Sequence, residues 1–216
     1  MSISLKKELF IEFGDKNLIF LVAEFKQNDE INILDKRILA IEEIKDGHIL
    51  NLTNIINIIQ KSLNDIEKKI DFIFKNINVI TNLKDYECTN VSGFKKLNNS
   101  QINKDDISFI NNNIKSAIFK NEVNKSIIHI FNSKFNLDKV EMDNLPIGLF
   151  GNFYSHQLTF FLLNNNDVKN IKQIFNKCNL NVSRIILKSF AQGMSLINNN
   201  NNLESFFNID LRKNFS

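Results

Sequence analysis

The side chains that most often carry out chemistry in proteins are few in this sequence, which has three histidines and two cysteines. His129 lies inside the apolar run IIHIF, and we interpret it as a hydrogen-bonded histidine of the core. His156 stands at the beginning of an expected strand, with no cysteine or aspartate at the spacing of a catalytic triad. Neither Cys88 nor Cys178 sits in a motif that activates a thiol or binds zinc. We therefore expect no catalytic set and no metal site.

The composition is that of a folded chain of moderate charge. Of its 216 residues, 43% are hydrophobic and 24% are charged, which suffices for one large domain or two small ones. The net charge of +3 is too small to indicate nucleic acid by itself, although the pI of about 8.7 leaves open a basic module for nucleic acid or anionic membrane. Two distant cysteines, and no apolar run of roughly 18 residues, lead us to expect a soluble, reduced, cytoplasmic protein.

The elements that must position any site begin with a sheet. Its expected antiparallel strands are residues 9–13, 18–25 and 31–41, with tight turns at Gly14–Asn17 and at Asp46-Gly47. Apolar residues then recur at three- and four-residue intervals from Leu52 to Ile70, which predicts one helix with an apolar stripe facing the sheet. A strand at residues 77–81 completes this unit.

The character of the sequence changes near residue 83. Residues 86–97 read as a strand broken at Gly93, followed by a polar link and an amphipathic helix whose N-terminal end is favoured by Asp105 and Asp106. The residues expected to share one face of this helix are Ile107, Ile110, Ile114, Ala117 and Ile118. With two further strands, residues 126–131 and 157–163, these elements predict a small α+β unit at residues 83–163.

Pro146 is the only proline in the chain, and it lies between the last two of these strands. Proline fixes its own φ and favours an extended Leu145, while Gly148 and Gly151 allow backbone angles that other residues avoid. We expect a rigid turn here that leads the chain into the sheet. The final part of the chain predicts a helix at residues 168–178, a strand at 182–187, a short helix at 191–196, a loop at Asn198–Asn202 and a strand at 206–211.

Three segments, in this order and spacing, resemble FtsA, the actin-like family of bacterial cell division. They are IEFGDKNLIFLVAEF (residues 11–25), ILAIEEIKDGHILNLTNIINIIQKSL (38–63) and FNLDKVEMDNLPIGLFGN (135–152). The third is the most specific, because the family pattern F-x-L-D…N-P-I-G-M-x-G accounts for the lone proline and both glycines together. The segment NLNVSRIILKSFAQGMSLI (179–197) is also similar to the family. PilM, a pilus-assembly relative of FtsA, is the nearest alternative.

The resemblance implies an α/β fold in which an actin-like, ribonuclease-H-like subdomain is interrupted by a strand-helix-strand-strand insert. The implied domains are residues 1–82, the insert at 83–163, and a return segment at 164–216 that begins a second half. In the same way, Asp138 matches the family's F-x-L-D motif, where we expect it to form a turn and accept backbone hydrogen bonds.

In the actin-like family two hairpin turns wrap the phosphates of ATP, and carboxylates hold the waters of a magnesium ion. The resemblance places the first turn at Gly14, Asp15, Lys16 and Asn17, and the second at Asp210. Both depart from the family pattern: Glu12 replaces the leading aspartate, Asp15 and Lys16 replace serine or threonine, and Leu-Arg-Lys-Asn follows Asp210 where the family has glycines. We therefore expect no ATP hydrolysis by this chain alone; the binding of ATP and magnesium is left open only for a longer parent chain.

These features together favour a non-enzymatic scaffold of cell division that acts through protein contacts of the insert. The partners implied by the resemblance are division proteins, FtsA-like protomers or FtsZ, at the cytoplasmic face of the inner membrane; neither nucleic acid nor direct membrane contact is expected. The alternative is the N-terminal half of an actin-like ATP-binding protein whose nucleotide site needs a second half. An isolated half would expose its interdomain face, which predicts a partner chain or poor solubility.

Overall fold

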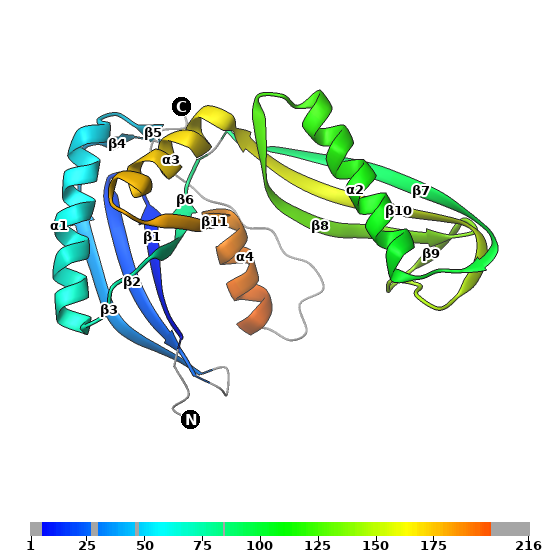
Figure 1. Ribbon diagram of the computed structural model, residues 1–216, viewed down its shortest axis with the longest axis horizontal. Coiled ribbons are helices and arrows are strands. Elements are labelled where there is room, and N and C mark those ends of the chain that lie inside the picture. The colour runs from blue at the N-terminus through cyan, green and yellow to red at the C-terminus, as the bar shows by residue number, and fades with distance from the viewer. Residues whose placement is uncertain (1–5, 27–29, 46–47, 84, 200–216) are drawn as a thin grey trace. The chain divides into compact units, whose positions relative to one another are not determined.

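The computed structural model describes residues 6–26, 30–45, 48–83 and 85–199. The chain forms two compact units (Figure 1). The second unit is Asp85–Lys169, and the first contains the residues before and after it. The sequence placed the insert at residues 83–163, so the second boundary lies further along the chain than expected.

The first unit is built on a five-stranded sheet with the strand order β11-β6-β1-β2-β3. The meander predicted at the N-terminus is confirmed, because β1 pairs antiparallel with β2, and β2 pairs antiparallel with β3. The strands β6 and β11 then extend the sheet in parallel with β1. The strands are β1 (Lys6–Phe13), β2 (Asn17–Phe25), β3 (Ile31–Ala40), β6 (Asn76–Thr81) and β11 (Asn181–Leu187).

One face of this sheet is covered by the helices α1 (Leu52–Ile70) and α3 (Asn165–Lys177). The part of α3 that belongs to this unit begins at Asn170. Along β1, Leu9, Ile11 and Phe13 alternate and are buried, and the ring of Phe13 meets Phe175 of α3 edge-on at 5.8 Å. The helices also contact each other, since the Gln60 amide donates a hydrogen bond to the Lys177 carbonyl at 3.0 Å. The apolar stripe predicted for α1 faces the sheet, because its residues Ile55, Ile59, Leu63 and Ile66 are buried.

Helix α1 begins and ends with specific caps. The Asn51 side chain accepts a hydrogen bond from the Asn54 N–H at 3.1 Å, and Asp71 closes the helix in the left-handed region with φ of 53°. The Glu67 carboxylate then accepts a hydrogen bond from the Phe74 N–H at 2.8 Å. This bond fixes the course of the chain between α1 and β6.

The remaining predictions for this unit concern one turn and the C-terminal part of the chain. The short strands β4 (Ile44–Lys45) and β5 (His48–Ile49) flank the turn predicted at Asp46-Gly47, but those two residues lie outside the described part. The last helix was predicted too short, because α4 (Lys188–Asn199) includes Asn198 and Asn199, which the sequence placed in a loop. The remaining asparagines of that loop and the strand predicted at residues 206–211 lie outside the described residues.

The second unit is an antiparallel sheet with the order β7-β10-β8-β9, covered on one face by helix α2 (Lys104–Asn121). Along the chain it reads strand, helix, strand, strand, with the short β9 as an addition. Three strands are longer than the sequence indicated: β7 (Glu87–Gln101), β8 (Lys125–Leu137) and β10 (Phe150–Asn164). The fourth, β9 (Val140–Met142), was not predicted.

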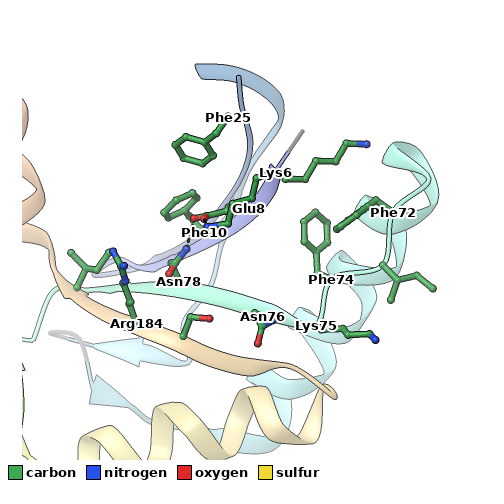
Figure 2. Close-up of a pocket in the computed structure, with 14 residues that line it drawn as sticks. Lys6, Glu8, Phe10, Phe25, Phe72, Phe74, Lys75, Asn76, Asn78 and Arg184 are labelled. Atoms are coloured by element: carbon green, nitrogen blue, oxygen red, sulfur yellow. Dashed lines mark hydrogen bonds and ion pairs between the residues drawn. The ribbon is translucent and has the colours of Figure 1, made fainter. Parts of the chain in front are cut away.

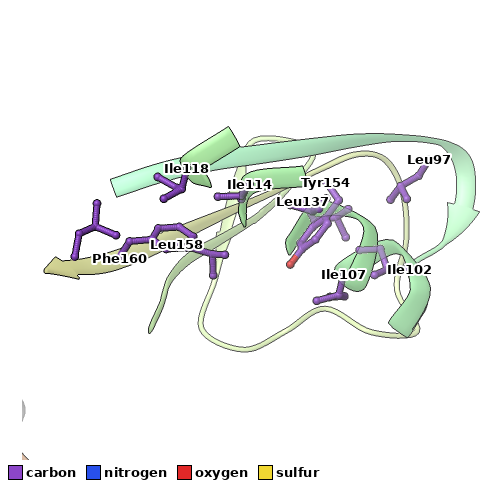
Figure 3. Close-up of a cluster of buried hydrophobic side chains, with 11 residues drawn as sticks. Leu97, Ile102, Ile107, Ile114, Ile118, Leu137, Tyr154, Leu158 and Phe160 are labelled. Atoms are coloured by element: carbon purple, nitrogen blue, oxygen red, sulfur yellow. The ribbon is translucent and has the colours of Figure 1, made fainter. Parts of the chain in front are cut away.

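The core of this unit lies between α2 and the sheet (Figure 3). It comprises Leu97, Ile102, Ile107, Ile110, Ile114, Ile118, Leu137, Tyr154, Leu158, Phe160 and Leu162. Ala117, predicted to share the buried face, is exposed, because it lies at the margin of the stripe that Ile110, Ile114 and Ile118 form. The predicted break at Gly93 is also wrong: β7 continues through this glycine, where a Cβ would lie 2.6 Å from Cγ2 of Ile110. The glycine thus allows α2 to approach the sheet.

The turn at Pro146 is as predicted. Gly148 has φ of 90°, which side chains disfavour, and its N–H donates a hydrogen bond to the Ile102 carbonyl at 2.9 Å. In return, the Ile102 N–H donates to the Leu149 carbonyl at 2.9 Å. The buried Pro146 and these two bonds tie the turn to the start of α2 and deliver the chain into β10.

Candidate functional site

The turn at Gly14–Asn17 lies at the carboxyl ends of three parallel strands. Phe13 of β1 pairs with Thr81 of β6, which pairs with Leu187 of β11, so the residues that follow these strands meet at one edge of the sheet. In open α/β sheets such an edge is the usual place for a ligand. We refer to Gly14–Asn17, with Glu12, Asn82 and Lys188, as the turn site.

The backbone of the turn is tight. The Gly14 N–H donates a hydrogen bond to the Asn17 carbonyl at 3.0 Å, and the Lys16 carbonyl accepts one from the Ile41 N–H at 3.0 Å. A Cβ on Gly14 would lie 1.9 Å from Oδ1 of Asn17, so a side chain at this position requires Asn17 to move. The hairpin therefore has the close backbone that the sequence indicated.

The charged side chains of the turn site are engaged with one another. The Lys188 Nζ donates to the Glu12 carboxylate at 2.6 Å, and both side chains are partly buried. The Asp15 carboxylate accepts a hydrogen bond from the Asn82 amide at 3.1 Å. The sequence missed Asn82 and Lys188 as members of this site, although each directly follows a parallel strand, which is the signal that would have found them.

The charges of the turn site cancel. Glu12 and Asp15 are negative and Lys16 and Lys188 are positive, while a phosphate needs an excess of positive charge or several converging N–H groups. Asp210, predicted in the second phosphate turn, lies outside the described residues. Within the described part of the chain, no cluster of three or more His, Cys, Asp or Glu residues that could hold a metal ion is found.

Burial shifts the pKa values of His129, His156 and Cys178. His129, which we interpreted as a core residue, lies outside the core of the second unit: it is half-buried and packs against Phe131 and Phe161, and this burial lowers its pKa. His156 is buried in the middle of β10 rather than at the start of a strand; its Nε2 lies 3.0 Å from Oδ1 of Asn132 and burial lowers its pKa. Burial raises the pKa of the Cys178 thiol to about 11, which keeps this thiol protonated at neutral pH.

Asp138 has the role that the sequence predicted. Its Oδ1 accepts hydrogen bonds from the N–H groups of Asn152 and Phe153 at 2.9 and 2.8 Å, and its own N–H donates to the Phe153 carbonyl at 2.9 Å. Its φ of 49° is in the left-handed region that aspartate tolerates in turns. The aspartate thus connects the end of β8 to the start of β10.

The sheet face of the second unit that lies opposite α2 carries aromatic rings that the sequence reasoning missed. Along β10, Phe153 and Phe161 alternate with the buried Tyr154 and Phe160, which places them on this open face. Phe94 stacks on Phe153 at 5.3 Å. Three further rings surround Phe161, at 5.8, 6.4 and 5.6 Å: Tyr86, His129 and Phe131. We call these six residues the aromatic face.

The chain is similar in sequence to FtsA proteins. No protein-family model matches it. It is 25% identical over 199 residues to the cell division protein FtsA of Buchnera aphidicola subsp. Schizaphis graminum, covering 91% of this chain and 47% of that protein. To FtsA of Escherichia coli K12 it is 20% identical over 187 residues, covering 87% and 44% respectively. The chain thus spans about half the length of the curated relatives it matches.

A solved structure supports the fold. The chain matches the "PilM-PilN type IV pilus biogenesis complex" with a TM-score of 0.58 and 7% identity, covering 91% of this chain and 52% of that one. In the described residues, no helix is long and apolar enough to cross a membrane. The described sheet orders, the PilM likeness and the FtsA matches agree: this chain has the actin-like fold and resembles the FtsA family over most of its length.

Proposed function

We propose that this chain works in bacterial cell division as an FtsA-like, non-enzymatic scaffold whose insert, Asp85–Lys169, binds other proteins. The observation that carries the proposal is the aromatic face. Its supporting context is the similarity to proteins that are named for cell division, over 87 to 91% of this chain. The partners we propose are division proteins, FtsA-like protomers or FtsZ, at the cytoplasmic face of the inner membrane.

The aromatic face has the chemistry of a protein-binding surface. Phe94 leaves 63% of its surface exposed although it stacks on Phe153, and such rings are the side chains that contribute most to binding energy in protein interfaces. Between the two groups of rings the face is polar, with Thr159 donating a hydrogen bond to Asn90 at 2.6 Å. Apolar anchors around a polar stretch resemble the mixed composition of interfaces between separately folded proteins.

The edge of the same sheet adds a second means of contact. Strand β7 is long and pairs with β10 on one side only, so it presents a row of backbone groups on its other side. A partner strand can extend such a sheet through backbone hydrogen bonds. We therefore propose that the partner contacts the aromatic face close to the β7 edge, where Phe94 lies.

For the nucleotide we propose that this chain alone binds neither ATP nor magnesium. The ion pair of Glu12 with Lys188 and the carboxylate of Asp15 support this view, because they leave the turn site without a net positive charge. The second candidate is one half of an actin-like ATP-binding protein. It is favoured by the tight Gly14 hairpin at the carboxyl ends of β1, β6 and β11, and it needs a nucleotide site completed by further chain.

The scaffold proposal is tested by localisation. In the cell of origin, the full chain fused to a fluorescent protein is expected to collect at the division site. The double variant Phe94→Ala, Phe153→Ala is expected to lose this localisation, since removal of interface aromatics commonly costs about 2 kcal/mol or more, roughly thirtyfold in affinity. Circular dichroism of the purified variant checks that the insert remains folded.

The matched control is Phe119→Ala. Phe119 lies on α2 of the same unit and is 61% exposed, against 63% for Phe94, but it is not part of the aromatic face. This control is expected to localise like the unchanged chain. Unchanged localisation of the double variant, or loss in both, would count against binding through the aromatic face.

A further inference from the structure

The first unit has a groove on the sheet face that α1 and α3 leave uncovered. Its volume is about 850 Å³, and it lies where β1, β6 and β11 begin, at the opposite end of these strands from the turn site (Figure 2). Because side chains alternate along β1, Phe10 points to this face while Leu9 and Ile11 enter the core. We call this hollow, with the residues named below, the basic groove.

The floor and one wall of the basic groove are apolar. Phe10, Phe25 and Ile186 line it from three strands. The wall is Phe72–Phe74, the segment that follows α1, in which the rings of Phe72 and Phe74 meet edge-on at 4.9 Å. The Glu67 bond to the Phe74 N–H holds this wall in place, yet Ile73 remains 76% exposed. An apolar lining with one fixed, exposed wall is suited to receive apolar side chains.

The charge on the groove is strongly positive. Four cations line it, Lys6, Lys7, Lys75 and Arg184, against the single carboxylate of Glu8. That carboxylate is occupied, because Lys6 lies 2.5 Å from it and the Asn78 amide donates to it at 2.9 Å. The groove therefore has an excess of positive charge that nothing lining it balances.

The remaining cations are placed at the rim. The Nζ of Lys7 lies over the Phe72 ring at 5.4 Å from its centroid. Lys75 and Arg184 are exposed and make no ion pair with any carboxylate in the described part of the chain. Their charges are thus available to a ligand that brings its own carboxylates.

We propose that the basic groove docks an acidic segment of a partner protein, with its apolar side chains on Phe10, Phe25 and Ile186 and its carboxylates at Lys75 and Arg184. Charge complementarity favours an acidic ligand over a second copy of this chain, whose net charge is +3. The concave shape favours a peptide over a bilayer, because a flat surface meets the rim without reaching the floor. The groove belongs to a different unit from the aromatic face, so this inference stands apart from the scaffold proposal.

The test uses the full chain and a fluorescein-labelled synthetic peptide of repeated Glu-Phe-Asp-Leu units. Fluorescence anisotropy is expected to show saturable binding that weakens as salt rises. A second peptide, with Gln and Asn in place of Glu and Asp, is expected to bind at least about tenfold more weakly, because it keeps the apolar side chains and loses the charge.

Two double variants of the chain decide where the peptide binds. Lys75→Glu with Arg184→Glu is expected to weaken binding at least about tenfold, since both rim charges are reversed. Lys61→Glu with Lys172→Glu makes the same change of net charge on exposed positions of α1 and α3 outside the groove, and is expected to change binding less than about threefold.

Several results would overturn the inference. Equal weakening by both double variants means that only the overall charge matters. Absence of saturable peptide binding excludes this ligand class. Binding of phosphatidylglycerol vesicles without peptide binding makes the groove a lipid contact, and a dimer in sedimentation that the groove variant alone dissociates makes it a contact between copies of the chain.

Discussion

Single residues at the ends of elements hold this structure together. Asp106, buried at the start of α2, accepts a hydrogen bond from the Asn103 N–H at 2.9 Å while the Asn103 side chain accepts one from the Asp106 N–H at 3.0 Å. Lys95 of β7 lies 2.5 Å from the same carboxylate. Asp138 performs a similar task between β8 and β10. Two aspartates thus fix the connections on which the insert depends.

The bond from Lys95 lowers the pKa of Asp106 below its usual value of 3.8. A lowered folded-state pKa gives stability that is present above pH 3.8 and is lost as the pH falls through the folded pKa. Asp106→Asn is therefore expected to cost about 1 to 3 kcal/mol of unfolding free energy at pH 7, and less below pH 3.8. Urea denaturation at pH 7 and pH 3 measures both values.

Asp105→Asn is the control for this prediction. Asp105 is also in the first turn of α2, but it is exposed, so the substitution is expected to change stability by less than about 0.5 kcal/mol. An Asp106→Asn variant that loses the same stability at both pH values would show that the contribution of Asp106 does not depend on its charge.

Among the elements of the insert, α2 packs closely on β7. Gly93 is the contact point, because a Cβ there would lie 2.6 Å from Ile110 and 3.0 Å from Ile114. Gly93→Ala is expected to destabilise the chain by about 1 to 3 kcal/mol, since the helix or the strand must shift to admit the methyl group. Thermal or urea denaturation measures the change.

Ser92→Ala, at the neighbouring exposed position of β7, is expected to alter stability by less than about 0.5 kcal/mol. If Gly93→Ala proved as stable as Ser92→Ala, the close approach of α2 would be adjustable rather than fixed.

How far the sequence predicts these elements depends on the range of the interactions that form them. The five strands of the first sheet and the helices α1 and α3 were predicted because their apolar residues recur at regular intervals. The length of β7 was missed because Asn98 and Asn99 interrupt the strand with φ of 52° and 62°, after which Ser100 pairs again with Gly151 of β10. Similarly, Glu12 and Lys188 lie 176 positions apart, so their contact follows from the parallel pairing of β1, β6 and β11 and not from the residues near either one.

At the scale of the whole molecule, nucleotide titration of the turn site tests the proposal that this chain alone binds no ATP. The chain covers 44 to 47% of the relatives named above, and the charges of its turn site cancel. We expect isothermal titration of this chain with ATP and magnesium to give no measurable heat of binding. A longer chain from the same source, if it completes the site, is expected to bind.

Lys188→Ala serves as a second probe of the same expectation. Removing the lysine leaves the Glu12 carboxylate without its partner, which makes the turn site more negative, so ATP binding is not expected to appear. Binding of ATP by the unchanged chain at micromolar concentration would contradict the proposal and favour the ATP-binding alternative.

The antiparallel pairing of β7 with β10 also has a consequence for how the chain folds. Strands β6 and β11 must pair although Asn76 and Asn181 are separated by the whole insert. Once Glu87 is paired with Leu162, the insert is closed on itself, and for the growing parallel sheet it behaves as a short loop. Shortening the effective loop in this way reduces the entropy cost of joining β11 to β6 by about 1 kcal/mol. The insert therefore assists the folding of the unit that it interrupts.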